Sequence, residues 1–389
     1  MRVALISSSF YPAFSFGGPI FSTWELSKRL SEKNTDIYVS TTNSNLNKKL
    51  HVDTNNFISI KKGLFVKYYN EEIINIFSFS FLKGVLSDIR NSDIVYLQYL
   101  FHYTVLISLI YSFFCKKKVI LCPRGSFSAY TLNGNNKYLK YLWIIFFIKP
   151  FLNMIHWHAS SHLEKRDILQ MFPKASVSII SDVIDFESLQ EGIVKLNKED
   201  LIYNYTGKKF SNISHVFFSM GRLHHIKRFD SLIHAFYKFL KTENNAKLII
   251  AGPDYGVREK LVNQIHELGL IESVFLIGEI DHNQKKNILN NCDYFTLASD
   301  FESFGIVILE AISCGLPVVI SNNTPWNDIE DNNCGIFTSN KIEDLHNSFK
   351  KVIKTEYNHD NIKNYTRLKY NSDVIADQFN DLINVYIRD

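Results

Sequence analysis

The sequence predicts an α/β protein made of two Rossmann-like, doubly wound domains that face each other across a cleft. Short apolar runs typical of buried strands alternate with segments of helical periodicity along the chain. Because a helix follows nearly every strand, the sheets are expected to be mostly parallel. The alternation is interrupted at residues 182–212, which are polar and weakly patterned, so we place a linker there.

The predicted first domain spans residues 1–181 and the second spans residues 213–372, while the last helix, 373–389, is a candidate to pack back onto the first domain. Strands are expected in the first domain at residues 3–7, 36–41, 65–68, 94–97, 119–121, 154–159 and 177–180, and helices at 20–30, 78–90 and 137–153. Strands are expected in the second at 216–220, 247–251, 274–276, 294–298, 318–321 and 335–337, and helices at 229–240, after residue 305, and near 341–354. The helix that ends the chain is expected near 373–387.

Composition excludes several classes of protein. With 389 residues, 46% of them hydrophobic and 21% charged, the chain can bury two ordinary cores and is not expected to be disordered. A net charge of +4 is too small to indicate a nucleic-acid partner. The five cysteines form no Cys-x-x-Cys pair, which argues against zinc and disulfides and favours a reducing cytosol. The start, residues 1–6, is too short an apolar run for a secretory signal and is expected to be a strand.

Two long apolar stretches, 94–115 and 141–155, are interrupted by polar residues or by Lys149-Pro150, so we expect buried or surface-associated elements in place of membrane spans. The predicted helix 137–153 carries lysines amid aromatic and aliphatic residues. Two interpretations stay open: the helix lies on an anionic membrane, or it is partly buried and its lysine stems run along apolar surface.

Two features of the first domain are candidates for contact with an anion. Gly17-Gly18-Pro19 stands between a predicted strand and a helix, where backbone N–H groups and the helix dipole favour negative charge. An ordinary tight connection explains the glycines equally well. Arg124 follows the strand at 119–121, at the sheet edge where α/β folds bind ligands; the alternative is a surface arginine after a turn.

The second domain carries the stronger candidates. Arg222 and Lys227 lie between the strand at 216–220 and the next helix, and a guanidinium with an ammonium at such a junction suits a diphosphate. Glu302 and Glu310 flank a strand–helix turn and are expected to grip different parts of an extended ligand. The simpler alternatives are a solvated basic loop, and a helix cap with an exposed glutamate.

Taken together, these segments resemble a known family. Gly221-Arg222-Leu223 with Lys227, Glu302-Ser303-Phe304-Gly305-Ile306 with Glu310-Ala311, and Gly315-Leu316-Pro317-Val318-Val319 resemble the donor-binding half of retaining GT-B glycosyltransferases, known as group 1 or family 4. The resemblance covers most of the chain and is strongest from 215 to 320. Gly17-Gly18-Pro19 is similar to the glycine-rich loop of the family's acceptor domain, and Pro123-Arg124-Gly125 to a segment of bacterial members that build surface polysaccharides.

The resemblance implies a role for each matching residue. Arg222 and Lys227 would neutralise the donor diphosphate, Glu310 would hold the ribose diol, and Glu302 would contact sugar hydroxyls. The backbone at Phe304, Gly305 and Ile306 would approach the sugar and phosphate, Gly18 would approach the diphosphate from the first domain, and Ile280 would lie against the base.

The resemblance also implies the reaction: transfer of a hexosyl or N-acetylhexosaminyl group, with retention, from a UDP- or GDP-linked sugar to a glycan or lipid-linked glycan in bacterial capsule, O-antigen or lipopolysaccharide synthesis. The expected place is the cytoplasm, at the inner face of the plasma membrane with a peripheral contact, and no nucleic-acid partner is expected. The sequence shows no Asp-x-Asp metal signature, so no metal or other cofactor is expected.

One position departs from the family, because many relatives carry a histidine where this chain has Arg124. Arg124 is also a candidate catalytic residue, since arginine can support a phosphate or sugar oxygen, but it is a poor general base. Two other functions stay open: a nucleotide-sugar epimerase of the same fold, and a non-catalytic partner subunit.

Overall fold

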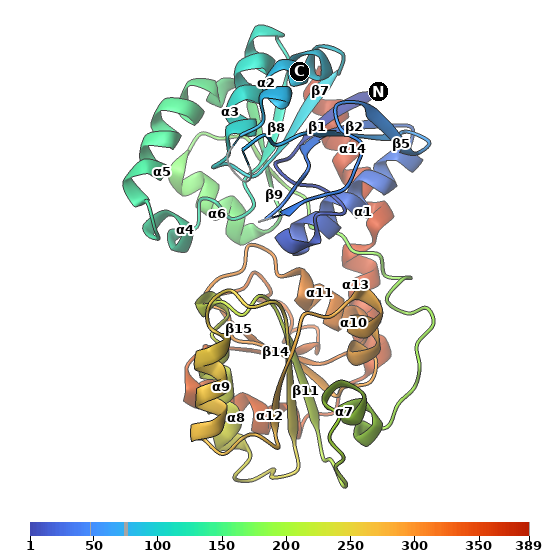
Figure 1. Cartoon of the computed structure of the whole chain (residues 1–389), viewed down its shortest axis with the longest axis vertical. Helices are drawn as coiled ribbons and strands as arrows, with labels where there is room; N and C mark the ends of the chain where they lie inside the picture. The colour runs from blue at the N-terminus through green and yellow to red at the C-terminus, as the bar shows by residue number, and fades with distance from the viewer. Residues whose placement is uncertain (47, 74–76, 389) are drawn as a thin grey trace. The chain divides into compact units, whose positions relative to one another are not determined.

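The structure is a computed structural model that describes residues 1–46, 48–73 and 77–388, and the chain divides into two compact units (Figure 1). Unit 1 comprises Met1–Ile184 together with the C-terminal residues from Tyr370 onward, and unit 2 comprises Asp185–Lys369. Asn47 of the polar segment 43–56, and Asp389 at the end of the predicted last helix, lie outside the described residues.

Unit 1 is built on an eight-stranded sheet with the order β10-β9-β8-β7-β1-β2-β6-β5. All its neighbours pair in parallel except β5, an antiparallel edge strand that the sequence did not predict. The strands are β1 (Arg2–Ile6), β2 (Asp36–Thr42), β5 (Phe57–Lys61), β6 (Leu64–Tyr69), β7 (Ile94–Gln98), β8 (Val119–Cys122), β9 (Ile155–Ala159) and β10 (Val177–Ile179). A short antiparallel ladder joins β3 (Ser44–Asn45) to β4 (Lys48–Lys49).

The helices of unit 1 are α1 (Gly18–Glu32), α2 (Phe79–Arg90), α3 (Tyr103–Phe114), α4 (Ala129–Asn133), α5 (Lys137–Trp143), α6 (His162–Met171) and α14 (Ser372–Arg388). They cover both faces of the sheet, and side chains alternate between two cores along each strand. On β1, Val3 and Leu5 enter one core while Ala4 and Ile6 enter the other.

The C-terminal helix α14 is part of unit 1. It packs beside α1 (Figure 1), and the side chains of Ile375, Phe379 and Ile383 are fully or almost fully buried in the core that contains Val3 and Leu5. Two segments from opposite ends of the chain therefore share one core.

Unit 2 contains a six-stranded, fully parallel sheet with the order β13-β12-β11-β14-β15-β16. Its strands are β11 (Val216–Met220), β12 (Lys247–Ala251), β13 (Val274–Gly278), β14 (Tyr294–Leu297), β15 (Val318–Ser321) and β16 (Gly335–Thr338). Its helices are α7 (Lys198–Thr206), α8 (Phe229–Phe239), α9 (Arg258–Glu267), α10 (His282–Leu289), α11 (Ile306–Ser313), α12 (Ile342–Val352) and α13 (His359–Tyr370). The strand order reverses between β11 and β14, which is where doubly wound folds bind ligands.

The linker predicted at 182–212 is wrong for most of its length. Residues from Asp185 onward belong to unit 2 and include helix α7. Leu189, Leu201 and Ile202 are buried there. The buried apolar residues of this stretch are irregularly spaced among polar ones and so produce no clear period, which is why the sequence suggested a linker.

The predicted helix 137–153 is also wrong as one regular helix. Helix α5 ends at Trp143, a π-helical segment continues through Ile144–Ile148, and a 3₁₀ segment covers Lys149–Met154. Pro150 has no N–H and clashes with a preceding carbonyl in a regular helix, so the change of geometry there is expected. No helix within the described ranges is long and apolar enough to cross a membrane.

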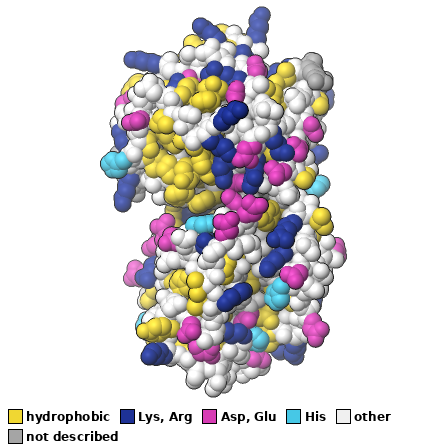
Figure 2. Space-filling view, turned by 90° about the vertical axis from the view of Figure 1, so that its right-hand side faces the viewer, with side chains coloured by type: hydrophobic (Ala, Val, Ile, Leu, Met, Phe, Trp, Pro, Cys, Tyr) yellow, Lys and Arg dark blue, Asp and Glu magenta, His cyan; other side chains and the backbone are white. Residues whose placement is uncertain are grey.

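Figure 2 shows hydrophobic side chains gathered on the face of unit 1 that it presents, whereas the hydrophobic side chains on the face of unit 2 in the same view are scattered among charged and other side chains.

Candidate functional site

The candidate site lies at the switch point of the sheet in unit 2. The segment Gly221–Arg228 leaves the carboxyl end of β11, and the segment Ala298–Gly305 leaves the carboxyl end of β14. These strands are neighbours, and the N–H of Asp300 donates to the carbonyl of Ile226 at 2.8 Å. Arg222, Lys227 and Glu302 therefore lie at one edge of the sheet, although Lys227 and Glu302 are 75 residues apart in the chain.

Lys227 and Glu302 are in direct contact. The Lys227 ammonium pairs with Oε1 of Glu302, and the hydroxyl of Ser299 donates to the same oxygen at 2.7 Å. Both side chains are 13% exposed. An ammonium has three N–H donors, so this contact orients Lys227 and leaves it able to donate to a second acceptor.

Arg222 is placed differently. Its side chain is exposed, and its guanidinium carbon lies 5.1 Å from the ring centre of Tyr255. The adjoining backbone is held firmly, because the N–H of Leu223 donates to the carbonyl of Pro253 at 2.8 Å. The backbone next to the exposed Arg222 side chain is thus fixed by a hydrogen bond.

Two glycines allow this close packing of the strand ends. A Cβ on Gly252, whose φ is +146°, would lie 1.9 Å from the carbonyl oxygen of Gly221. A Cβ on Gly221 would lie 3.2 Å from Cε of Lys227, so the lysine stem lies directly on that glycine. Because both residues are glycines, the segment that carries Arg222 and Lys227 can lie this close to the end of β12.

The turn before α11 is built around Gly305 and Trp326. Gly305 has φ +87°, a conformation that favours glycine, and precedes α11 without any side-chain cap. The indole N–H of Trp326 donates to the carbonyl of Phe304 at 2.6 Å, and the two rings pack edge to face at 5.3 Å. The first N–H groups of α11, beginning at Ile306, are not capped by a side chain and carry the positive end of the helix dipole.

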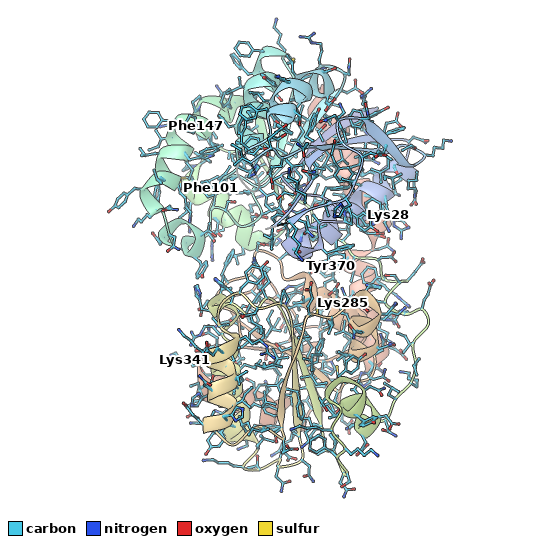
Figure 3. The ribbon with its side chains drawn as sticks, viewed as in Figure 1. Lys28, Phe101, Phe147, Lys285, Lys341 and Tyr370 are labelled. Carbon is cyan, nitrogen blue, oxygen red and sulfur yellow. The ribbon has the colours of Figure 1, made fainter. Side chains whose placement is uncertain are left out.

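Glu310 points into a buried ion pair. It lies in the second turn of α11, and its Oε1 accepts from the ammonium of Lys285 on α10 at 2.5 Å. Both side chains are at most 10% exposed. The alternative of an exposed glutamate is therefore wrong. Figure 3 labels Lys285 on α10, above the strands of the sheet in that view.

Sequence analysis gave Lys285 no role in the site. Its signal was weak, because the 25 residues that separate it from Glu310 match no helix or strand period. It also missed the pair between Arg228 and Asp300, whose closest atoms are 3.2 Å apart. Asp300 accepts a further bond from Asn340 at 2.6 Å, which fixes the start of the turn that carries Glu302.

Ile280 follows β13 and is half-buried next to the N-cap of α10. Asp281 caps that helix together with Gln284 in a reciprocal capping box. The position of Ile280 is thus fixed by a well-formed helix start. Its contact with a base stays a prediction.

The remaining two predicted residues belong to unit 1. Gly18 is the first residue of α1, after Gly17 at φ +83° and before Pro19. Its contact with a diphosphate stays a prediction.

The side chain of Arg124 is buried within unit 1, so the alternative of a surface arginine is wrong. Its Nη1 pairs with Asp182, its Nε donates to Gln98 at 2.7 Å, and its Nη2 donates to Thr23 at 3.1 Å. Burial disfavours the charged guanidinium, but Asp182, Cys122 and Tyr96 together outweigh burial and raise the pKa of Arg124. A catalytic role stays a prediction, although this guanidinium already has three protein partners.

Comparison with known proteins identifies the domain that holds the site. Residues 208–369 match the family model "Glycosyl transferases group 1". This part of the chain is a group 1 glycosyltransferase domain. It contains Arg222, Lys227, Glu302, Glu310 and Lys285.

Curated relatives agree over shorter spans. An uncharacterized glycosyltransferase of Methanocaldococcus jannaschii is 37% identical over 103 residues, 26% of each chain. The N-acetylgalactosamine-N,N'-diacetylbacillosaminyl-diphospho-undecaprenol 4-alpha-N-acetylgalactosaminyltransferase of Campylobacter jejuni is 29% identical over 212 residues, 54% of this chain and 52% of that one. The chain spans about a quarter to a half of the length of these relatives.

Solved structures show the fold of both units. HepE of Anabaena in complex with UDP and glucose superposes with a TM-score of 0.76 at 17% identity, covering 99% of this chain and all of that one. WaaG, a glycosyltransferase involved in lipopolysaccharide biosynthesis, superposes with a TM-score of 0.69 at 16% identity over 98% of this chain and 99% of that one. The predicted GT-B fold is confirmed: each unit is a Rossmann-like domain of that fold.

Proposed function

We propose that the protein is a retaining glycosyltransferase. It transfers a hexosyl or N-acetylhexosaminyl group from a UDP- or GDP-linked donor to a glycan or lipid-linked glycan acceptor in bacterial capsule, O-antigen or lipopolysaccharide synthesis. The observation that carries this proposal is the placing of Lys227, paired with Glu302, beside the uncapped start of α11 in a group 1 domain.

Charge distribution supports a diphosphate ligand. Arg222, the remaining donors of Lys227 and the first N–H groups of α11 are the groups that a diphosphate requires. HepE was solved with UDP and glucose, which agrees with a nucleotide-sugar donor. The Campylobacter relative is named for a diphospho-undecaprenol acceptor, which agrees with a lipid-linked acceptor here.

In the proposed mechanism, the enzyme stabilises the diphosphate as it leaves. The bond between the anomeric carbon and the diphosphate oxygen breaks, and negative charge grows on that oxygen next to Arg222 and Lys227. The acceptor hydroxyl attacks on the same face and gives its proton to the leaving phosphate oxygen. A divalent ion has no part in this step.

The two glutamates have different roles in this mechanism. Glu302 fixes the ammonium of Lys227 and contacts a sugar hydroxyl with its remaining acceptor capacity. Glu310, held by Lys285, accepts from the ribose diol. Each glutamate therefore has two roles in this mechanism: it accepts from a hydroxyl of the donor and it positions a lysine.

We propose a cytoplasmic location at the inner face of the plasma membrane. The five cysteines are free thiols, and four of them are buried, as suits a reducing compartment. A lipid-linked acceptor would bring the protein to the membrane surface.

The test is incubation of the purified protein with a panel of nucleotide sugars and of lipid-linked and soluble glycans. We expect product and nucleotide release that depend on donor and acceptor, and a loss of about 100-fold in turnover for Glu302→Gln. Glu259→Gln, at an exposed position of α9, is the control and should match the wild type. Donor conversion without acceptor would favour an epimerase, and absence of nucleotide binding would favour a non-catalytic subunit.

A further inference from the structure

One segment of unit 1 is unusual in charge. Between Asp93 and Glu164 the sequence contains no acidic residue, but it contains six lysines and Arg124. Besides the buried strands β7, β8 and β9, the segment contains α3, α4, α5 and the π-helical turn after α5. Lys116, Lys137 and Lys149 are exposed, so this side of unit 1 presents positive charge to solvent.

The same segment exposes large apolar side chains. Among the described residues, twenty large hydrophobic side chains are exposed, and nine of them lie here. We call eight of these, all except Tyr130, the apolar surface: Phe113, Phe114, Tyr138, Leu139, Leu142, Ile145, Phe146 and Phe147. Tyr138 is 82% exposed and Phe114 is 74% exposed. Figure 3 shows Phe147 on the outer side of unit 1.

These outward side chains belong to a well-packed element. On the inner side of the same helix, Ile144 and Ile148 are buried in the core, and the indole N–H of Trp143 donates to the carbonyl of Leu100 at 3.1 Å. The outward residues Tyr138, Leu142 and Ile145 follow at spacings of four and three, which puts them on one face of a helix. The segment 137–148 is therefore apolar on both sides: one side packs into the core of unit 1 and the other is exposed to solvent.

The end of α3 joins this surface. The ring of Phe113 lies 6.1 Å from the ring of Phe151, in the 3₁₀ segment that follows the π-helical turn. Phe114 packs edge to face on Phe113 at 5.8 Å, and the exposed Lys116 follows two residues later. Two parts of the chain thus contribute to one aromatic and basic region.

We propose that the apolar surface docks unit 1 on the interface of a bilayer that contains anionic lipids. This inference rests on the proposed function, since a lipid-linked acceptor would be met there. Exposed aromatic and aliphatic side chains insert at the level of the headgroups, while the lysines, which have no acidic residue among them in this segment, contact anionic headgroups.

A second copy of the chain fits this surface less well than a bilayer does. An isologous contact would bring Lys116, Lys137 and Lys149 of both copies together, and this segment supplies no carboxylate to pair with them. Charge complementarity therefore selects an anionic occupant.

The test is co-sedimentation of the full-length protein, without donor, with vesicles of phosphatidylcholine that contain either no anionic lipid or about 30% phosphatidylglycerol. We expect binding to the anionic vesicles that weakens in high salt. The variant Phe114→Ser/Phe146→Ser should bind about tenfold more weakly. Leu368→Ser, at an 82% exposed position of α13, is the matched control and should bind like the wild type.

The charge variant Lys137→Glu/Lys149→Glu should also bind anionic vesicles about tenfold more weakly, while Lys260→Glu/Lys354→Glu, at exposed positions of unit 2, should not. Equal binding by wild type and Phe114→Ser/Phe146→Ser, or no preference for anionic lipid, overturns the proposal. A concentration-dependent dimer that this variant abolishes, without vesicle binding, would assign the surface to a second copy.

Far-ultraviolet circular dichroism checks that each variant is folded. Nucleotide binding, measured separately by thermal shift with UDP and GDP, distinguishes the two proposals. Vesicle binding without nucleotide binding would contradict the proposed function alone, and the reverse result would contradict the docking surface alone.

Discussion

Lys227 with Glu302 and Lys285 with Glu310 are the contacts on which the candidate site depends. The residue types of the site, and the strand–turn–helix segments that carry them, could be predicted from the sequence. The pairing could not, because the partners are 75 and 25 residues apart in the chain and meet only when the sheet has formed. Lys285 was left without a role for that reason.

Replacing Lys227 by methionine should weaken binding of a nucleoside diphosphate. A charge-assisted hydrogen bond contributes about 1.5–3 kcal/mol, so we expect roughly a 10- to 150-fold increase in Kd by isothermal titration calorimetry. Lys354→Met, at an exposed position of unit 2, is the control. Unchanged affinity in Lys227→Met would show that this lysine serves only to hold Glu302.

Replacing Lys285 by methionine should destabilise unit 2, because it leaves the Glu310 carboxylate buried without its partner. Breaking such a pair costs about 3–5 kcal/mol, whereas replacing both partners by apolar residues costs much less. Urea unfolding of Lys285→Met and of Lys285→Met/Glu310→Leu measures the difference. Equal stability of the two variants would contradict the account of a buried ion pair.

His158 should make unit 1 sensitive to acid. Its Nε2–H donates to the carbonyl of Ile180 and its Nδ1 accepts from the hydroxyl of Tyr96, both at 2.8 Å, so the neutral ring uses both nitrogens. Burial lowers the pKa of His158 from 6.5 to about 4. Because the folded-state pKa lies below the unfolded value, the stabilisation is present above pH 6.5 and is lost as the pH falls toward 4.

The expected loss is roughly 3 kcal/mol over that pH range. The measurement is the free energy of unfolding between pH 7 and pH 4 for the wild type and for His158→Gln, with Tm recorded in parallel. His102, whose burial also lowers its pKa to about 4, remains in both proteins, so their difference isolates His158. Parallel pH profiles would contradict the prediction.

At the scale of elements, strands were predicted better than helices. The strands at 216–220, 247–251 and 318–321 match the structure at both ends, since short apolar runs bounded by turn residues leave little choice of limits. Helix α13 was missed because its apolar stripe is reduced to Ile362 and a few widely spaced residues in a polar sequence. Helix α3 was missed for the opposite reason, because apolar residues surround it and no period stands out.

The contact between strand ends at Gly252 predicts a large effect of a small change. In Gly252→Ala, the new Cβ would overlap the carbonyl of Gly221. We expect the free energy of unfolding to fall by about 2–4 kcal/mol. We also expect weaker nucleotide binding, because Arg222 and Lys227 would shift. Gly256→Ala is the matched control, because that glycine also has a positive φ but no atom within 4 Å of its Cβ. It should lose only about 1 kcal/mol. Thermal unfolding and nucleotide titration of both variants compare the two effects.

At the scale of the whole molecule, the two units have separate cores, and unit 1 is discontinuous in sequence. Phe379 of α14 is part of the core of unit 1, and the centre of its ring lies 4.7 Å from the ring centre of Tyr96 on β7. The sequence marked the last helix only as a candidate for the first domain, because helical periodicity shows that a face is buried but not which core receives it.

Removing the Phe379 side chain should therefore affect one unit only. We expect Phe379→Ala to destabilise unit 1 by about 3–5 kcal/mol. Hydrogen exchange followed by mass spectrometry should show faster exchange in β1, β7 and β9 with little change in β11 and β14. Val385→Ala, at a 59% exposed position of the same helix, is the control. Faster exchange throughout unit 2 would show that the cores are not independent.

The shared core of α1 and α14 also sets an order of events during synthesis on the ribosome. The first 184 residues of unit 1 leave the exit tunnel early, but their core lacks α14 until residues 372–388 have been made. All of unit 2 emerges before that helix does. We therefore expect the usual rule that the N-terminal domain completes its folding first not to apply here, because unit 1 cannot complete its core before α14 has been made.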